Sequence, residues 1–201
     1  LHRVDRRQRQ MCIRDRSLAQ TKIGYVFQNY REAMFPWLRT IDNIAYPLRL
    51  EGRSKAEVDA RVEELVASFD VKFDLKRYPY ELSGGQQQTA SIMRALAPGP
   101  EVLFLDEPFS ALDFEMTLFI REKLQEVFMQ TGTTMLLVSH DLEEAVYLAD
   151  QVLLLTKRPT RVAEILNYGD ARPRTVETLS EPSFIGMKKL SLEIFQREVR
   201  R

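Results

Sequence analysis

Short apolar runs alternate with longer amphipathic segments along most of the chain. The apolar run 102–105 is typical of a buried strand in a parallel sheet, the run 135–138 predicts another buried strand, and the run 152–155 predicts the next strand. The β-rich run 23–27 predicts another strand, and residues 161–166 follow the last run closely enough to pair with it after a turn. Strands that alternate with helices predict an α/β fold with a largely parallel sheet, covered by helices on both faces.

Polar residues at the ends of the amphipathic segments predict where helices begin and end. Three pairs have capping-box spacing: Ser54 and Glu57, Ser83 and Gln86, and Asp141 and Glu144. Gly132 predicts the end of a helix over 114–131, and Ser180 the cap of a last helix with Pro182 in its first turn. In the 114–131 helix the residues expected to face inward are the apolar ones: Phe119, Ile120, Leu124, Val127 and Phe128.

Composition excludes several classes of protein. Hydrophobic residues make up 44% of the 201 positions, enough to bury a core and too many for a disordered chain. The 29 Lys and Arg balance 29 Asp and Glu, which argues against a general nucleic-acid binder. The single cysteine, Cys12, and two histidines argue against a disulfide framework and a Cys/His zinc site. No apolar run approaches the about 18 residues of a membrane span, and we expect no secretory signal.

Residues 1–16 differ from the rest of the chain. They contain six Arg and two Asp, a local charge of +4, and they show no apolar periodicity. A basic arm for nucleic acid or anionic lipid is one interpretation. The favoured interpretation is a non-domain, disordered tail that resembles a translated sequencing adapter, followed by a partial domain over 17–201.

Two carboxylates, Asp106 and Glu107, directly follow the apolar run 102–105. Ligands of open α/β sheets bind at the carboxyl ends of the strands. An Asp at this place can hold Mg²⁺, and the adjacent Glu can act as a general base toward water. Taken alone, this segment could also be a strand followed by a plain acidic turn.

A pair of glycines, Gly84 and Gly85, follows Ser83 at the start of a predicted helix. Glycines at a helix N-terminus leave backbone N–H groups accessible, which suits the close approach of a phosphate group. A glycine turn before a capped helix is the alternative for this pair by itself.

Five segments in this order resemble the motifs of the ABC-transporter ATPases. The segments are VFQ (26–28) for the Q-loop, LSGGQ (82–86) for the signature, VLFLDEP (102–108) for Walker B, SALD (110–113) for the D-loop and SHD (139–141) for the switch-histidine loop. The resemblance covers residues 22 to about 156. The PFS after Glu107, the stretch 35–50 and the tail ARPRTVETLSEP (171–182) are most similar to ATPases of nitrate, sulfonate and taurine-type importers.

The resemblance implies a P-loop NTPase-like ATPase domain with a helical signature subdomain over about 30–97 and a tail helix over about 181–199. It implies that ATP and Mg²⁺ bind, with Asp106 and Gln28 at the metal. Glu107 would be the general base, and His140 would contact the γ-phosphate. Asp113 would communicate across a dimer, and the signature residues would contact ATP held by the partner: Ser83, Gly84, Gly85 and Gln86.

The partners implied by the resemblance are a second copy of the ATPase, transmembrane permease subunits and, indirectly, a solute-binding protein. Nucleic acid is not expected as a partner. The expected location is the cytoplasmic face of the plasma (inner) membrane, as a peripheral protein. The transported solute is not encoded in this chain, because such importers select it in other subunits.

None of the eight glycines has the spacing of a phosphate-binding loop, G-x-x-x-x-G-K-[ST]. The resemblance places that loop upstream of the Q-loop and its strand beside the strand ending at Asp106. We therefore expect an ABC ATPase truncated at its N-terminus and inactive on its own. A soluble non-transport ABC ATPase fragment and a non-catalytic remnant remain as alternatives.

Overall fold

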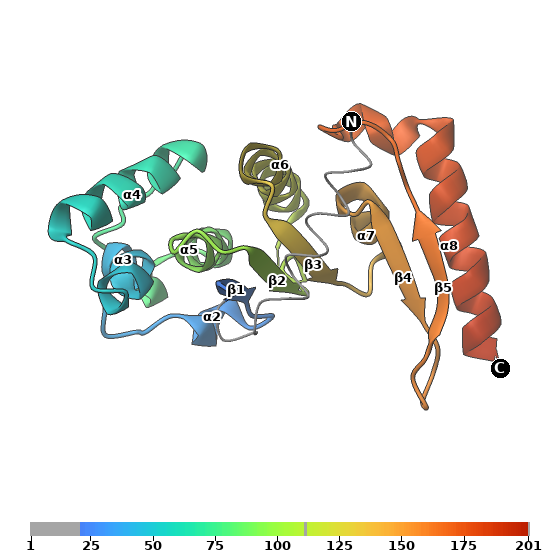
Figure 1. Cartoon of the computed structure of the whole chain (residues 1–201), viewed down its shortest axis with the longest axis horizontal. Helices are drawn as coiled ribbons and strands as arrows, with labels where there is room; N and C mark the ends of the chain where they lie inside the picture. Colours follow the sequence, from blue (N-terminus) through green and yellow to red (C-terminus); the bar gives the residue numbers. More distant parts are fainter. Residues whose placement is uncertain (1–20, 111, 201) are drawn as a thin grey trace.

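A computed structural model describes residues 21–110 and 112–200 (Figure 1). The expected basic tail, 1–16, lies outside the described residues. The elements fall into an all-helical segment, a parallel sheet, and a hairpin that packs with the last helix; in Figure 1 the sheet lies between the other two.

Three of the predicted strands form one parallel sheet. They lie in the order β1 (Ile23–Val26), β2 (Val102–Asp106) and β3 (Thr134–Val138). The remaining strands, β4 (Gln151–Leu155) and β5 (Val162–Asn167), pair antiparallel in a separate hairpin. Because β2 has a neighbour on each side, the expectation that another strand would pair beside it is wrong. Among the described residues, the open edges of this sheet belong to β1 and β3.

All the regular secondary structure between β1 and β2 is helical. It comprises α2 (Tyr30–Ala33), α3 (Thr40–Leu50), α4 (Lys55–Ser68), the 3₁₀ turn η2 (Pro79–Glu81) and α5 (Gly84–Leu96). Two predicted capping boxes form here with both reciprocal bonds, Ser54 with Glu57 and Ser83 with Gln86. These helices therefore begin where the polar pairs predict.

The second half of the chain adds four helical elements. They are α6 (Phe114–Thr131), α7 (Leu142–Leu148), the 3₁₀ turn η3 (Val176–Ser180) and α8 (Pro182–Arg200). Gly132 ends α6 in the left-handed conformation at φ 65°, as predicted. Ser180 does not cap α8: its hydroxyl donates to the carbonyl of Glu177 inside η3, and α8 begins at Pro182. The prediction that Ser180 caps α8 was wrong, because its hydroxyl is engaged in the preceding 3₁₀ turn.

One face of the parallel sheet packs against the helices. Leu103 and Leu105 are fully buried, and Leu137 packs against the same cluster. Gly24 lets β1 approach α5 closely, because a Cβ there would lie 2.6 Å from the carbonyl oxygen of Ala95. The other face carries Ile23, Tyr25, Leu136 and Val138, each exposed by 43% or more. Within the described residues, the expected helical cover is thus found on one face only.

Helix α6 buries more than its apolar stripe. Ile120 and Leu124 are buried as predicted, while the other expected inward residues are only partly buried. A second, polar stripe at helical spacing is also buried: Thr117, Arg121 and Gln125. This stripe faces residues of α7 and of the segment before η3, which it contacts through hydrogen bonds and ion pairs. A second small core, centred on Val146, Leu154 and Phe184, joins α7, the hairpin and α8.

Candidate active site

The candidate active site lies where β1, β2 and β3 end. Gln28 follows β1 by two residues, Asp106 is the last residue of β2, and His140 follows β3 by two residues. Parallel strands in register bring their carboxyl ends to one edge of the sheet. The sheet therefore gathers four predicted residues that are far apart in the sequence: Gln28, Asp106, Glu107 and His140.

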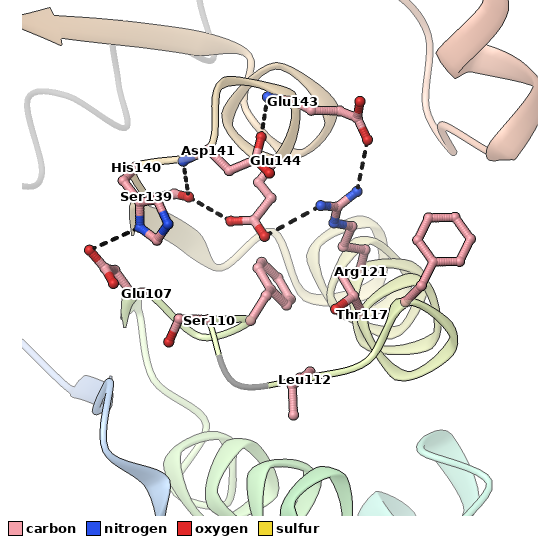
Figure 2. A pocket seen from close by; sticks show the side chains of 12 residues that line it. Glu107, Ser110, Leu112, Thr117, Arg121, Ser139, His140, Asp141, Glu143 and Glu144 are labelled. Atoms are coloured by element: carbon pink, nitrogen blue, oxygen red, sulfur yellow. Dashed lines mark hydrogen bonds and ion pairs between the residues drawn. The ribbon is translucent and has the colours of Figure 1, made fainter.

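Glu107 is the centre of this group. One carboxylate oxygen accepts a hydrogen bond from the Gln28 side-chain amide at 2.6 Å. The other lies 3.3 Å from Nδ1 of His140, a contact that Figure 2 shows. Its backbone N–H donates to the carbonyl of Val138 at 2.8 Å, which ties the residue to β3. The carboxylate is thus held between the segments that follow β1 and β3.

The backbone of Glu107 is in the left-handed region, with φ at 42°. This conformation costs a non-glycine residue about 1–2 kcal/mol, and such strain gathers at functional sites. The turn directs the Glu107 carboxylate toward Gln28 and His140, and no glycine could supply that carboxylate. The strain is therefore an observation in favour of function at this position.

Asp106 makes a contact that the motif did not indicate. Its Oδ2 accepts a hydrogen bond from the Tyr25 hydroxyl at 3.0 Å. That bond to the carboxylate, followed by burial and by the negative charge, raises the pKa of Tyr25. Tyr25 lies on the neighbouring strand and on the same face of the sheet as Asp106. The period-two alternation of side chains predicts this contact only when the strand register is also known. The carboxylate of Asp106 and the amide oxygen of Gln28 are the hard donors that Mg²⁺ prefers, and this donor set fits that ion.

The switch-histidine loop is held by a buried ion pair. Ser139 donates to Glu144 at 2.5 Å, and Glu144 lies 3.4 Å from the guanidinium of Arg121, which is almost fully buried. The N–H of Asp141 donates back to the Ser139 hydroxyl at 3.0 Å. Asp141 does cap α7, through the N–H of Glu143, but Glu144 does not close the predicted capping box because its side chain bonds Ser139.

A polar pocket of about 330 Å³ opens beside this loop. Figure 2 shows Glu107 and His140 on one side of it and Arg121 and Ser110 on others. The His140 side chain is 74% exposed, so its ring is accessible from solvent. Arg121 was missed by the sequence analysis; the only available signal was its helical spacing from Thr117 and Gln125.

The signature residues form a separate cluster at the start of α5. Ser83 and Gln86 cap each other, and a Cβ on Gly84 would collide with the hydroxyl of Tyr30. A Cβ on Gly85 would lie 2.7 Å from the Met116 side chain at the start of α6. Close packing against the buried Tyr30 ring therefore favours glycine at 84, whereas at 85 the neighbour is a flexible methionine side chain that can shift.

Asp113 lies beside that cluster. Its carboxylate accepts the N–H of Met116 at 2.8 Å and so caps α6. A buried glutamine of the signature helix, Gln88, donates to the carbonyl of Pro108 at 2.7 Å and links α5 to the turn after Glu107. Within the described residues, none of the contacts of Ser83, Gln86 or Asp113 reaches Glu107 or His140, so the structure does not bring the two predicted groups together in one chain.

The described residues provide neither a membrane-spanning helix nor a preformed metal cluster. No described helix combines the length and apolarity of a membrane span. No group of three or more His, Cys, Asp or Glu side chains in residues 21–110 and 112–200 is arranged to hold a metal by itself. A cation at Asp106 would therefore need oxygen ligands from a bound phosphate or from water.

Comparisons with known proteins point to one family. The family model described as "ABC transporter" matches residues 2–110, a range that also includes residues 2–16 of the basic segment. The taurine import ATP-binding protein TauB of Escherichia coli O6:H1 is 40% identical over 184 residues, covering 87% of this chain and 71% of the relative. The aliphatic sulfonates import ATP-binding protein SsuB of Bacillus subtilis is 37% identical over 174 residues, covering 87% and 65%. Among solved structures, a dimeric post-hydrolysis state of the ATP-binding cassette MJ0796 bound to ADP and Pi has a TM-score of 0.65 and 27% identity, covering 78% of this chain and 70% of that one.

Proposed function

The chain belongs to the ABC transporter family of ATPases, and on that premise we propose that it is the subunit that powers import of a taurine, sulfonate or nitrate-type solute. The observation that carries the ATPase role is the placement of Glu107 between Gln28 and His140. The similarity to taurine and sulfonate import proteins supports the class of solute.

Each residue of the edge cluster has a chemical role in this proposal. Glu107 accepts a proton from the water that attacks the γ-phosphate of ATP. His140, exposed and next to that carboxylate, donates a hydrogen bond to the γ-phosphate. Asp106 and Gln28 would hold Mg²⁺, which neutralises charge on the transferring phosphoryl group when it is bound. Tyr25 keeps the Asp106 carboxylate oriented.

The signature cluster acts on a second subunit. Ser83, Gly84, Gly85 and Gln86 contact ATP held by a partner copy, and Asp113 lies at the contact between the copies. The separation of this cluster from Glu107 within one chain supports such an arrangement, as does the dimeric state of the similar cassette structure. The dimer would bind permease subunits at the cytoplasmic face of the membrane as a peripheral protein.

A fusion protein tests this proposal. The part of the E. coli taurine import protein that precedes the region matching residue 21 would be joined to residues 21–201, and the fusion produced in cells lacking the native protein. We expect taurine uptake, ATP hydrolysis, and loss of both in Glu107→Gln. The control is Glu63→Gln, an exposed carboxylate of α4. Hydrolysis without uptake would show that residues 21–201 do not couple to a taurine-type permease, which would overturn the proposed importer class. Absence of Glu107-dependent hydrolysis would identify a non-catalytic remnant.

A further inference from the structure

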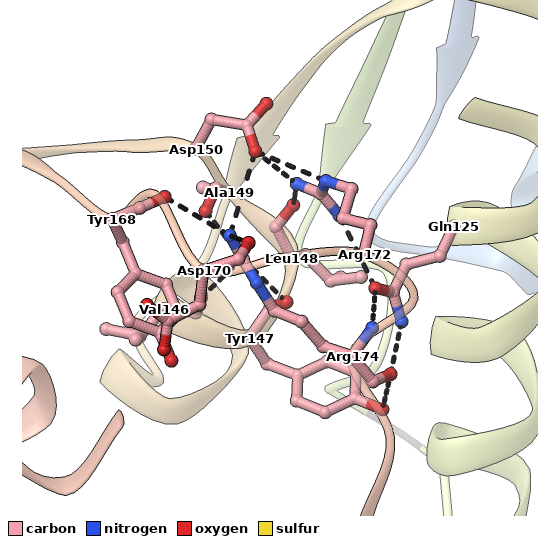
Figure 3. A network of polar contacts seen from close by, with 10 residues as sticks. All are labelled: Gln125, Val146, Tyr147, Leu148, Ala149, Asp150, Tyr168, Asp170, Arg172 and Arg174. Carbon is pink, nitrogen blue, oxygen red and sulfur yellow. Dashed lines mark hydrogen bonds and ion pairs between the residues drawn. The ribbon is translucent and has the colours of Figure 1, made fainter. Parts of the chain in front are cut away.

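The segment Ala171–Arg174 forms a clasp around the end of α7 (Figure 3). The side chain of Arg174 is completely buried. Its guanidinium donates to three carbonyls at the end of α7, those of Val146, Tyr147 and Ala149, at 2.7–3.0 Å. The same group stacks over the ring of Tyr168 with 4.4 Å between the guanidinium carbon and the ring centroid.

Arg172 binds the remaining carbonyl at the end of α7. It donates to the carbonyl of Leu148 at 2.5 Å and pairs with Asp150 at 2.9 Å. The last carbonyls of a helix have no partner inside the helix, and cations near them interact favourably with the helix dipole. Two arginines thus bind the four successive carbonyls 146–149, and charged donors fix the end of α7.

The clasp itself is anchored to α6. Gln125 accepts the N–H of Arg174 at 2.9 Å and donates to the Arg174 carbonyl at 2.8 Å. Tyr147, on α7, donates its hydroxyl to the same carbonyl at 2.5 Å. Because these groups are buried, they leave the clasp little freedom to move relative to α6.

We infer that this clasp positions His140 by way of α7. The helix has seven residues, and its N-cap, Asp141, is the neighbour of His140. Its first turn is held through Glu144 by Arg121, also on α6, and its last turn by Arg174. A helix of two turns that is held at both ends behaves as one rigid body, so a change in the contacts at its C-terminal end alters the position of its N-cap and of the adjacent His140. Arg174 and Arg172 are therefore positioning residues for the switch histidine, an inference that rests on the proposed function only for the role of His140.

The test uses the whole chain and the fact that it contains two histidines, His2 and His140. The ring cross-peaks of ¹³C-labelled histidine report the surroundings of His140, and His2, outside the described residues, is the internal reference. The variants are Arg174→Lys, which keeps the charge but loses the planar fork, and Tyr147→Phe, which removes one hydroxyl. Arg172→Gln is a third, less buried change, and Arg161→Gln in the exposed hairpin turn is the matched control.

We expect the His140 cross-peak to shift by more than a linewidth in Arg174→Lys and Tyr147→Phe, with His2 and the Arg161→Gln control unchanged. Amides of 142–148 should exchange about tenfold faster, as loss of a buried charged hydrogen bond allows. A merely structural clasp would lower the melting temperature and leave the His140 cross-peak in place, and that result would overturn the inference. If Arg174→Lys does not fold, the His140 cross-peak in Tyr147→Phe and Arg172→Gln tests the inference instead. Because no nucleotide is involved, a negative result leaves the ATPase proposal standing, while failure of the fusion protein leaves the clasp geometry standing.

Discussion

Gln28 donates its side-chain amide to the Glu107 carboxylate at 2.6 Å, across 79 positions of sequence. The bond joins the segment after β1 to the turn after β2, and His140 approaches the same carboxylate from the end of β3. The orientation of the proposed base therefore depends on two loops at once. A displacement of either loop would release one oxygen of Glu107.

The first prediction concerns hydrolysis by the chain as its sequence stands. It should show little or no ATPase activity, because phosphoryl transfer depends on positioning and charge stabilisation and the sequence has no phosphate-binding loop motif. Steady-state phosphate release measures this. Robust hydrolysis that disappears in Glu107→Gln would contradict the prediction.

A second prediction concerns the fusion protein with a phosphate-binding loop. General-base assistance contributes about 10²–10⁴-fold, so Glu107→Gln should lower kcat by a factor in that range. His140→Ala should lower kcat as well, because it removes a donor to the γ-phosphate. An effect of Glu107→Gln within a factor of two would mean that another group is the base.

Much of the fold and the centre of the site could be predicted from the sequence. Apolar or β-rich runs predicted β1 to β4, β5 was expected from its place after the turn that follows β4, and the motifs indicated Glu107 and His140. The burial expected along 135–138 was wrong, because Leu136 and Val138 lie exposed on the uncovered face of the sheet. The contact of Tyr25 with Asp106 depends on strand register, which periodicity alone does not supply.

The buried polar stripe of α6 was missed for a related reason. Thr117, Arg121 and Gln125 have the spacing of a helix face, but polar residues are usually solvated. Their burial depends on α7 and on Arg174, which is 49 positions from Gln125. Sequence spacing within one helix cannot show what a distant segment will cover.

The exposed sheet face gives a third prediction from two adjacent residues of β3. Leu136 is 49% exposed, whereas Leu137 packs against the core on the opposite face. Leu136→Thr should leave the free energy of unfolding nearly unchanged and reduce binding of an apolar dye. Leu137→Thr should cost about 1–3 kcal/mol, because it buries an unpaired hydroxyl. Equal destabilisation by both, measured by urea unfolding, would mean that the exposed face is covered in solution.

A fourth prediction concerns pH and the capping box of α4. The hydrogen bond from the Ser54 hydroxyl, and then the bond from the Ser54 N–H, lower the pKa of Glu57 below its usual 4.5. A lowered pKa in the folded state contributes stability that is present above the unfolded value and is lost as the pH falls through the folded value. The urea midpoint of Glu57→Gln should therefore lie below that of the unchanged chain at pH 7, and the two should converge as the pH falls through the folded pKa, which lies below 4.5. In a Ser54→Ala background the difference at pH 7 should shrink; a difference that persists at full size would show that Ser54 is not the cause.

The last prediction separates the backbone of Glu107 from its carboxylate. With φ at 42°, position 107 should give the most stable variant lacking a carboxylate when the new residue is glycine. Glu107→Gly should be more stable than Glu107→Ala by about 1 kcal/mol, since both lose the same carboxylate and only alanine keeps the left-handed strain.

Two other positions are controls for this prediction. At Asp70, which has φ at 43° in the turn after α4, the glycine variant should likewise be more stable than the alanine variant. Glu122, exposed inside α6, should show the opposite sign, because glycine costs about 1 kcal/mol in a helix interior. Urea unfolding of the three pairs measures this, and an alanine variant at 107 as stable as the glycine variant would show that the turn relaxes and stores no strain. The more stable Glu107→Gly should still be inactive in the fusion protein, since the strained turn is tolerated for the carboxylate that it places between Gln28 and His140.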